Sequence, residues 1–291
     1  MDFISAHTLD EAVAVLDRLG GDATLLAGGS DVMVQLERRE IDPGTLFHVE
    51  PLTELGAIEA DGHLHLGALV THRSIATSPL VASRHRSLAV AASLVGGWQT
   101  QAVGTIGGNI ANASPAADLV PPLLVHGATV SLASSSGERQ LPLGSFITGR
   151  RQTARRGDEL VTFVDLEEPP ERTADSFVKI GRRSAMEVSI VGVAVRLTLA
   201  ADGAVVEDLR IAVCSCGPLA FRAHDAERAL VGQPISADSL AAAGNALLAQ
   251  AQPIDDVRAS ASYRRRVLPR VLAKALDDCV HAVRPQLEAA S

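Results

Sequence analysis

Two short glycine-rich segments are the part of this 291-residue sequence whose residue types could do chemistry. They are Ala27-Gly28-Gly29-Ser30-Asp31 and Thr105-Ile106-Gly107-Gly108-Asn109. Paired glycines can take positive φ and carry no side chain, so consecutive backbone N–H groups can converge on an anion. The first segment lies between an apolar run and an expected helix, whose N-terminus favours a phosphate. Neither segment is a G-x-G-x-x-G fingerprint or a P-loop, since no Gly-Lys-Ser/Thr follows.

Polar side chains accompany both segments. Ser30 can cap the expected helix or donate to a phosphate oxygen, and Asn112 and Ser114 are uncharged donors that suit a pyrophosphate without a metal. Asp118 can accept hydrogen bonds from ribityl or ribose hydroxyls. Neither serine lies in a G-x-S-x-G elbow, which argues against hydrolysis. One Gly-Gly pair is more often only a turn, but two with such donors favour a dinucleotide phosphate. The pattern leaves FAD, NAD and ATP open.

Charge and hydropathy exclude other classes of protein. The net charge of -8 and pI of about 5.6 argue against nucleic-acid binding. No basic stretch followed by an apolar core opens the chain, and no apolar run is long enough to span a bilayer. We therefore expect a cytoplasmic protein that is not inserted in a membrane.

The cysteines and histidines give no metal centre. The chain has 3 cysteines, and Cys214-Ser-Cys216 cannot supply four thiolates to an iron–sulfur cluster. Such a sparse set also argues for a reducing compartment. His63-x-His65 lies on an expected strand with no third ligand in view, so we predict no metal site.

The elements that position these segments form an α+β protein of three units. Residues 1–55 are expected to alternate strand and helix, with a helix after the capping box Thr8-x-x-Glu11. Residues 56–171 form a second α+β unit that opens with a hairpin at Asp61-Gly62. Residues 172–291 are expected to form three antiparallel strands followed by helices, with Pro269 kinking or splitting the last helix.

At these motifs the sequence resembles a known family. The segments TLLAGGSDVMV, VGTIGGNIANASPAADLVPPLL, FVKIGRRSAMEVSIVGVAVRL, LRIAVCSCGPLAFR and SYRRRVLPRVL resemble the FAD-binding medium subunit of carbon monoxide dehydrogenase and the flavin domain of xanthine dehydrogenase, both molybdenum hydroxylases. The resemblance covers essentially the whole chain, in family order. It implies a vanillyl-alcohol-oxidase (PCMH-type) FAD-binding domain of two subdomains, followed by a C-terminal domain.

The resemblance also implies a set of FAD-binding residues. The first loop would hold the pyrophosphate from one side and the second from the other. Asp118 would contact the ribityl or phosphate region, Val161 and Val188 would be apolar contacts, and Lys179 would place a positive charge near the flavin. The complete set is Leu26, Ala27, Gly28, Gly29, Ser30, Asp31, Val32, Thr105, Gly107, Gly108, Asn109, Asn112, Asp118, Val161, Lys179 and Val188.

In that family the flavin carries the redox chemistry and the protein binds, orients and tunes it. The implied partners are a molybdopterin-binding large subunit and a [2Fe-2S] small subunit, in a heterotrimer or its dimer, with an external electron acceptor. The alternatives are a stand-alone FAD-dependent oxidase or dehydrogenase acting on a small metabolite, and a flavin-free scaffold.

The sequence departs from the family pattern at a few positions. It has Gln101-Ala102 before the second glycine motif, in a stretch expected to line the flavin, and Phe177 where relatives often carry Tyr. The Gln101-Ala102 departure mildly favours the stand-alone alternative. The insertion that holds a four-iron cluster in benzoyl-CoA-reducing relatives is missing.

Overall fold

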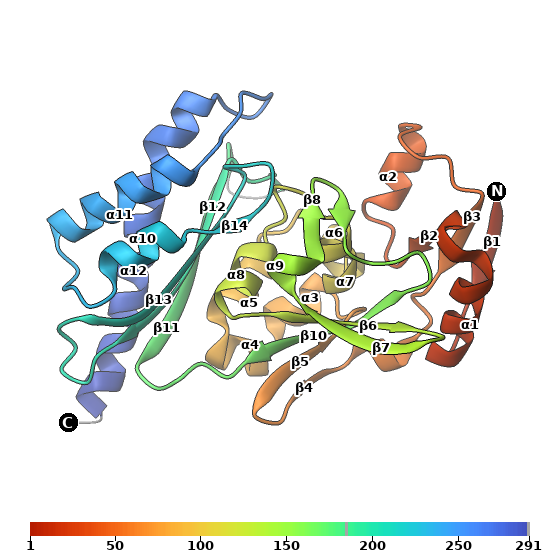
Figure 1. Ribbon diagram of the computed structural model, residues 1–291, viewed down its shortest axis with the longest axis horizontal. Helices are drawn as coiled ribbons and strands as arrows, with labels where there is room; N and C mark the ends of the chain where they lie inside the picture. Colours follow the sequence, from red (N-terminus) through yellow and green to blue (C-terminus); the bar gives the residue numbers. More distant parts are fainter. Residues whose placement is uncertain (184–185, 290–291) are drawn as a thin grey trace.

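The computed structural model describes residues 1–183 and 186–289. Within these ranges the strands form three main sheets, one after another along the chain, and a two-stranded hairpin. In Figure 1 the three units lie in a row along the long axis, with the N-terminal unit at one end and the C-terminal helices at the other.

The first unit is a parallel sheet in the order β1-β3-β2 with its connecting helices. Its elements are β1 (Asp2–Ser5), α1 (Leu9–Leu19), η1 (Gly20–Asp22), β2 (Ala23–Leu26), α2 (Val32–Glu37) and β3 (Thr45–His48). Thr8 caps α1 as predicted, since its Oγ1 accepts from the N–H of Glu11 at 3.2 Å. The Glu11 carboxylate accepts from the N–H of His7 at 2.8 Å. The strand β1 has no counterpart among the predicted elements.

The second unit is an antiparallel sheet in the order β4-β5-β10-β6-β7. Its strands are β4 (Ile58–Ala60), β5 (His63–Gly67), β6 (Thr129–Ser134), β7 (Gly137–Pro142) and β10 (Leu160–Glu167), and the small hairpin is β8 (Ile147–Gly149) with β9 (Gln152–Thr153). Its helices are η2 (Thr53–Gly56), α3 (His72–Thr77), α4 (Pro79–Arg84), α5 (Arg86–Ser93), α6 (Trp98–Val103), α7 (Ile106–Ala111), α8 (Val120–Val125) and α9 (Leu143–Phe146). Leu64 and Leu66 of β5 face the core while His65 faces away, as expected for a sheet with one covered face.

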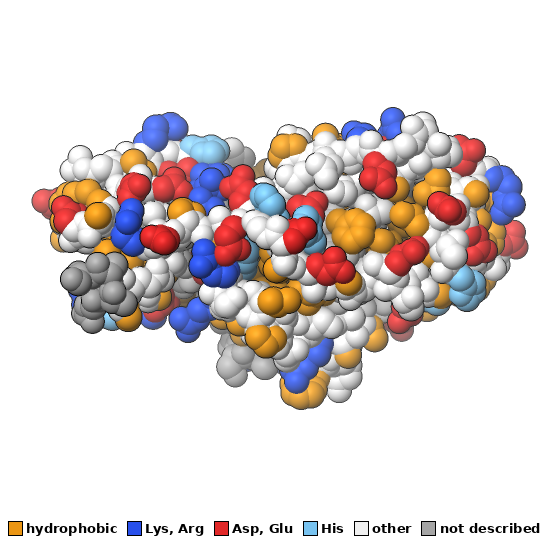
Figure 2. Space-filling model, turned by 90° about the horizontal axis from the view of Figure 1, so that it is seen from below, with side chains coloured by type: hydrophobic (Ala, Val, Ile, Leu, Met, Phe, Trp, Pro, Cys, Tyr) orange, Lys and Arg blue, Asp and Glu red, His pale blue; other side chains and the backbone are white. Residues whose placement is uncertain are grey.

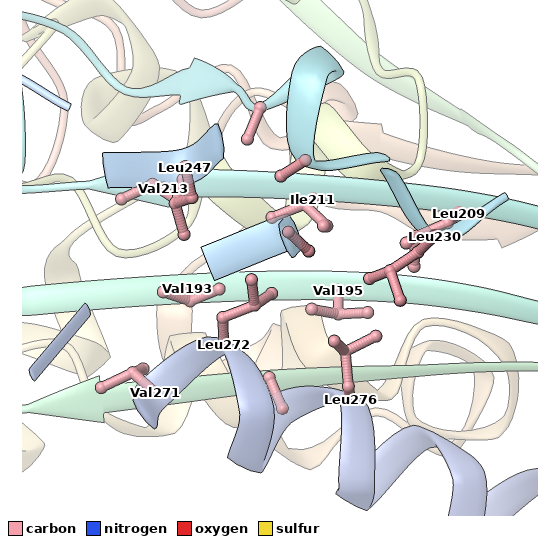
Figure 3. Close-up of a cluster of buried hydrophobic side chains, with 14 of the residues drawn as sticks. Val193, Val195, Leu209, Ile211, Val213, Leu230, Leu247, Val271, Leu272 and Leu276 are labelled. Atoms are coloured by element: carbon pink, nitrogen blue, oxygen red, sulfur yellow. The ribbon is translucent and has the colours of Figure 1, made fainter. Parts of the chain in front are cut away.

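The third unit is an antiparallel sheet in the order β11-β12-β13-β14 with helices against it. It contains β11 (Thr173–Ile180), β12 (Val191–Leu199), β13 (Val206–Cys214), β14 (Phe221–Arg222), α10 (His224–Leu230), α11 (Ala237–Gln250) and α12 (Ala261–Ala289). Figure 3 shows Val193, Val195 and Ile211 of this sheet pointing toward Leu247 and Leu272 of the helices. Together these side chains form the largest apolar core of the described chain.

The opposite face of the third sheet joins the second unit. Every residue of β12 is buried, because α12 contacts one face and α8 the other. The residues of this second interface include Phe177, Ala194 and Ala212 of the sheet and Ala91 and Val125 of α5 and α8. Alanine at these sheet positions lets the helices approach closely, so the third unit is fixed against the second.

The predicted α+β class is confirmed, with differences in detail. The three expected strands of the third unit are joined by the short β14. Helix α12 continues through Pro269, so the predicted split is wrong, while the predicted kink stays a prediction. The proline ring lies against Gly244 of α11. The predicted boundaries at 55/56 and 171/172 fall between the sheets, and the division of the chain into these three domains stays a prediction.

The charges are mixed over the surface. On the face shown in Figure 2, Lys and Arg side chains are scattered among acidic ones and do not gather in one patch. In the described part of the chain, no helix has the length and hydropathy needed to cross a membrane. The same residues contain no group of three His, Cys, Asp or Glu side chains placed to hold a metal ion.

Candidate functional site

A cavity of about 630 Å³ is lined by all three units, and both glycine segments lie in its wall. The first unit contributes residues of β2 and of the loop that follows it. The second unit contributes α7, the segment 114–118 and residues of β10, and the third contributes Met186, Glu187 and Val188. This volume is in the range of small-molecule and cofactor sites.

The first glycine loop presents free backbone amides where it enters helix α2. Gly28 lies so close to α6 that a Cβ atom would sit 1.6 Å from the carbonyl oxygen of Val103, and Gly29 has φ +71°. The loop then enters α2 without a side-chain cap. Among the described residues, nothing accepts from the N–H groups of Ser30, Asp31 and Val32. These consecutive free donors on the cavity wall fit an anionic ligand.

The second glycine segment is arranged differently. The first N–H groups of α7 donate within the protein: Ile106 to Val70 O (2.9 Å), Gly107 to Ala68 O (2.9 Å) and Gly108 to Thr105 Oγ1 (3.0 Å). The glycines allow this approach, since a Cβ on Gly107 would lie 2.7 Å from the Ala68 carbonyl oxygen. What remains for a ligand is chiefly Asn109, whose Oδ1 is buried without a partner. Side chains, more than amides, would therefore hold a ligand on this side.

A polar bridge connects the two sides of the cavity. Asn112 donates from Nδ2 to Asp31 Oδ1 at 2.9 Å, and its Oδ1 accepts from Arg151 at 3.0 Å. Arg151 lies at the β8–β9 turn with φ +56°. The two predicted residues Asp31 and Asn112 are thus brought together, and Arg151 joins them.

A buried ion pair lies at another part of the wall. Lys179 Nζ is 2.6 Å from Asp118 Oδ2 and donates to the Leu94 carbonyl at 2.8 Å. Ser189 donates to the other oxygen of Asp118. Burial raises the pKa of the Asp118 carboxyl above its ordinary value, against the opposing effect of Lys179. Asp118 lines the cavity, whereas Lys179 lies behind it and acts on the site through Asp118.

The structure brings nearly all the predicted residues to this one cavity. Those that line it are Ala27, Gly28, Gly29, Ser30, Asp31, Val32, Thr105, Gly107, Gly108, Asn109, Asn112, Asp118, Val161 and Val188. Leu26 is buried and, like Lys179, is not part of the lining.

The departures from the family pattern lie mostly outside the cavity. Gln101 is buried and donates to the carbonyls of Ser93 (2.8 Å) and Val95 (3.1 Å), so it fixes the backbone there. Of the stretch 98–103, only Thr100 lines the cavity. Phe177 packs in the interface between the units.

Sequence reasoning missed several lining residues, among them His72, Arg151, Arg155 and Met186. Burial lowers the pKa of His72 to about 4, and its Nδ1 has no partner among the described residues. No motif marks these residues, because each reaches the cavity only through the tertiary fold.

The three cysteines are buried thiols that form no disulfide. Cys214, Cys216 and Cys279 are free and buried. Burial raises the pKa of the Cys216 thiol to about 12, which disfavours the thiolate that a metal needs.

The polar groups and the glycines of the cavity wall fit FAD. The free amides of residues 30–32 and the unpartnered oxygen of Asn109 are polar groups without a partner among the described residues. The glycines remove side chains that would fill the cradle, and the buried Asp118 can accept from sugar hydroxyls.

Comparison with known proteins identifies the family. The family described as "FAD binding domain in molybdopterin dehydrogenase" matches residues 1–167, and the "CO dehydrogenase flavoprotein C-terminal domain" matches residues 176–279. The chain is 30% identical to the putative xanthine dehydrogenase FAD-binding subunit of Escherichia coli K12, over 99% of each. It is 28% identical to the carbon monoxide dehydrogenase medium chain of Hydrogenophaga pseudoflava, over 95% of this chain and 96% of the relative.

Solved structures agree with these matches. A chain of carbon monoxide dehydrogenase from Hydrogenophaga pseudoflava superposes with a TM-score of 0.92 at 29% identity, covering 97% of this chain and 98% of that one. A chain of quinoline 2-oxidoreductase from Pseudomonas putida 86 gives 0.90 at 26% identity, covering 97% and 98%. The chain therefore belongs to the FAD-binding subunits of molybdopterin-containing dehydrogenases of the carbon monoxide and xanthine dehydrogenase type, and its cofactor is FAD.

Proposed function

We propose that this chain is the electron-transfer subunit of a molybdenum hydroxylase complex. When bound, FAD supplies the redox chemistry, taking up electrons from the [2Fe-2S] clusters of a partner subunit and passing them to an external acceptor. The protein would work in the cytoplasm with a molybdopterin-binding large subunit and a small iron–sulfur subunit. The observation that carries the proposal is one cavity to which all three units contribute, lined by nearly every residue predicted to bind FAD.

Each part of the wall has a distinct task in this proposal. The amides of Ser30, Asp31 and Val32 would donate to the pyrophosphate from one side, and Nδ2 of Asn109 would donate to it from the other, while the free Oδ1 of Asn109 would accept from a hydroxyl or N–H of the cofactor. Asp118 would accept from hydroxyls of the ribityl chain, held in place by Lys179. Such fixed donors and acceptors orient a cofactor without rearrangement.

Exposed apolar side chains near the cavity support a protein partner. Met186 and Val188 line the cavity, yet 63% and 52% of their surfaces are exposed. Trp98 is 68% exposed, and the Arg73 guanidinium lies 3.9 Å from the centre of its ring. Met186 lies against Gly97, so these side chains form one rim. Large exposed apolar side chains in one place are typical of interfaces.

The names of relatives point the same way. One relative, 30% identical over 99% of this chain, is named subunit alpha of the 6-hydroxypseudooxynicotine dehydrogenase complex of Paenarthrobacter nicotinovorans. Others are named medium chains. We infer from these names that the present chain also works within a complex.

The test is affinity purification of the tagged chain from its own cells, with the visible spectrum recorded and co-purifying chains identified. We expect FAD, a [2Fe-2S] spectrum and two further chains, one carrying molybdopterin. A chain that elutes alone with FAD and oxidises a small metabolite would instead establish the stand-alone alternative. A colourless chain that takes up no added FAD would contradict the proposal and establish the flavin-free scaffold.

A further inference from the structure

Arg155 is a cation in the cavity wall, and only some of its hydrogen-bond donors have acceptors within the protein. One of its terminal nitrogens, Nη1, donates to the carbonyls of Arg156 (3.0 Å), Gly157 (3.5 Å) and Glu159 (2.7 Å). Among the described residues, nothing accepts from its Nε or its other terminal nitrogen. The side chain is half-buried and lines the cavity, so these donors are available to a ligand.

No carboxylate neutralises Arg155 in the described chain. The two nearest acids along the sequence pair with other arginines: Asp158 lies 3.4 Å from Arg156, and Glu159 uses its carboxylate for Arg139 at 2.5 Å and for Arg156 at 3.0 Å. Burial lowers the pKa of the Arg155 guanidinium from its ordinary value, against the opposing effect of the Glu159 and Asp158 charges. A partly desolvated cation without an anion is unfavourable unless a ligand meets it.

The position of Arg155 shows which end of the cavity it serves. The loop that carries it lies against η1, since a Cβ on Gly157 would be 2.7 Å from the amide nitrogen of Gly21. From there β2 runs toward the glycine loop at Gly28, a span of roughly 15 Å at ~3.3 Å per residue. Gly28 contacts Val103 at the end of α6, whereas Met186 of the apolar rim contacts Gly97 at the start of this helix. Arg155 therefore lies at the end of the cavity away from the rim.

The surroundings of Arg155 suit a flat, uncharged ring. Ala23, Thr24 and Leu25 of β2, which directly follows η1, line the cavity, and so does Leu160 at the start of β10. A guanidinium can stack on an aromatic face and donate along its edge to ring nitrogens.

We propose that Arg155 binds the adenosine half of FAD and makes the site selective for the dinucleotide over FMN. This rests on the proposed function, with the flavin toward the rim and the pyrophosphate at residues 30–32. The adenine ring lies against the apolar side chains of the two strands, and its ring nitrogens accept from the free in-plane donors of Arg155.

The experiment is titration of the full-length apoprotein with FAD and, separately, with FMN, followed by quenching of flavin fluorescence. Arg155→Met removes the guanidinium but keeps an apolar stem, and Arg155→Lys keeps the charge without the planar fork. Arg156→Met is the matched control, because Arg156 is an exposed neighbour that does not line the cavity. Thermal unfolding of each apoprotein reports on folding.

We expect Arg155→Met to raise the Kd for FAD about tenfold or more, the usual effect of losing hydrogen bonds to a charged group. The Kd for FMN should change less than about twofold, and Arg156→Met should change neither. If Arg155→Met does not fold, Arg155→Lys should still weaken FAD and spare FMN. An unchanged affinity for FAD, or an equal loss for FAD and FMN, would overturn the inference. Failure of the wild-type apoprotein to bind FAD would overturn the proposed function instead.

Discussion

Replacing Gly28 by alanine tests whether the first glycine loop must touch α6 for the cofactor site to exist. In the native chain a Cβ at this position would lie 1.6 Å from the carbonyl oxygen of Val103 and 2.4 Å from its carbonyl carbon. Both atoms are backbone, so no side-chain rotation relieves the clash. Cβ contacts under 3.0 Å essentially never occur, and the two segments would have to separate by about 1.4 Å.

The size of the effect follows from this separation. Overpacking of a well-packed site costs about 1–3 kcal/mol. The Tm of the apoprotein should therefore fall, by about 2–4 °C for each kcal/mol in a protein near this size. The shift also displaces the free amides of residues 30–32 from the opposite wall. A tenfold weaker FAD affinity would remove about 1.4 kcal/mol of the stabilisation that excess FAD gives.

Thermal unfolding of the apoprotein with and without FAD measures both effects. Gly44→Ala is the matched control, because a Cβ there meets nothing within 4 Å. Gly44→Ala should change the free energy of unfolding by no more than about 1 kcal/mol. The rise of the Tm with FAD should be the same as in the wild type. A Gly28→Ala protein with the wild-type Tm and the wild-type response to FAD would refute the reasoning that this contact forms the site.

Three further predictions concern buried charges. Asp118→Asn leaves Lys179 buried without its counter-ion, so urea unfolding should show a loss of about 3–5 kcal/mol, part of which a second change, Lys179→Met, restores. Asp256→Asn removes the carboxylate 2.8 Å from the buried Arg264; a similar loss is expected, and an unchanged midpoint would contradict it. Burial lowers the pKa of His85 to about 4 from 6.5. The unfolded chain therefore binds this proton first, and up to about 3 kcal/mol of stability should be lost through His85 as the pH falls from about 6.5 to about 4. His85→Gln should reduce the total loss by this amount, while the similarly buried His72 keeps its own contribution.

The two glycine segments could be predicted from the sequence because their signal is local. A strand, a glycine pair and a helix start are short-range features, and the backbone at Gly28 and Gly107 does approach its neighbours too closely for a side chain. The role of Lys179 was harder to predict. The resemblance indicated a charge near the flavin, but the sequence does not show that Asp118 lies between this charge and the cavity.

Other features depend on tertiary contacts that no local pattern encodes. Arg155 reaches the cavity only because its loop packs on η1. The strand β14 is two residues long and exists through its pairing with β13. Pro269 continues a helix because packing around it outweighs its unfavourable propensity, and Gly244 leaves room for the ring.

The third unit contributes residues 186–188 to the cavity wall. Arginines at and before the start of α12 fix the two residues that follow this segment. Arg258 donates to the Ser189 carbonyl at 3.1 Å, and Arg264 donates to the Ile190 carbonyl at 2.6 Å. Asp256 accepts from Arg258 Nη2 at 2.5 Å and forms an ion pair with Arg264 at 2.8 Å. The hydrogen bonds and charge of Arg258 lower the pKa of the Asp256 carboxyl, against the opposing effect of burial. Ser189 in turn donates to Asp118. We therefore expect a cofactor that contacts Asp118 and Val188 to bind more weakly when this cluster is disrupted, and by linkage its binding should stabilise the contact between the units. Affinity for FAD in this chain thus includes the free energy of packing the C-terminal unit onto the FAD-binding units.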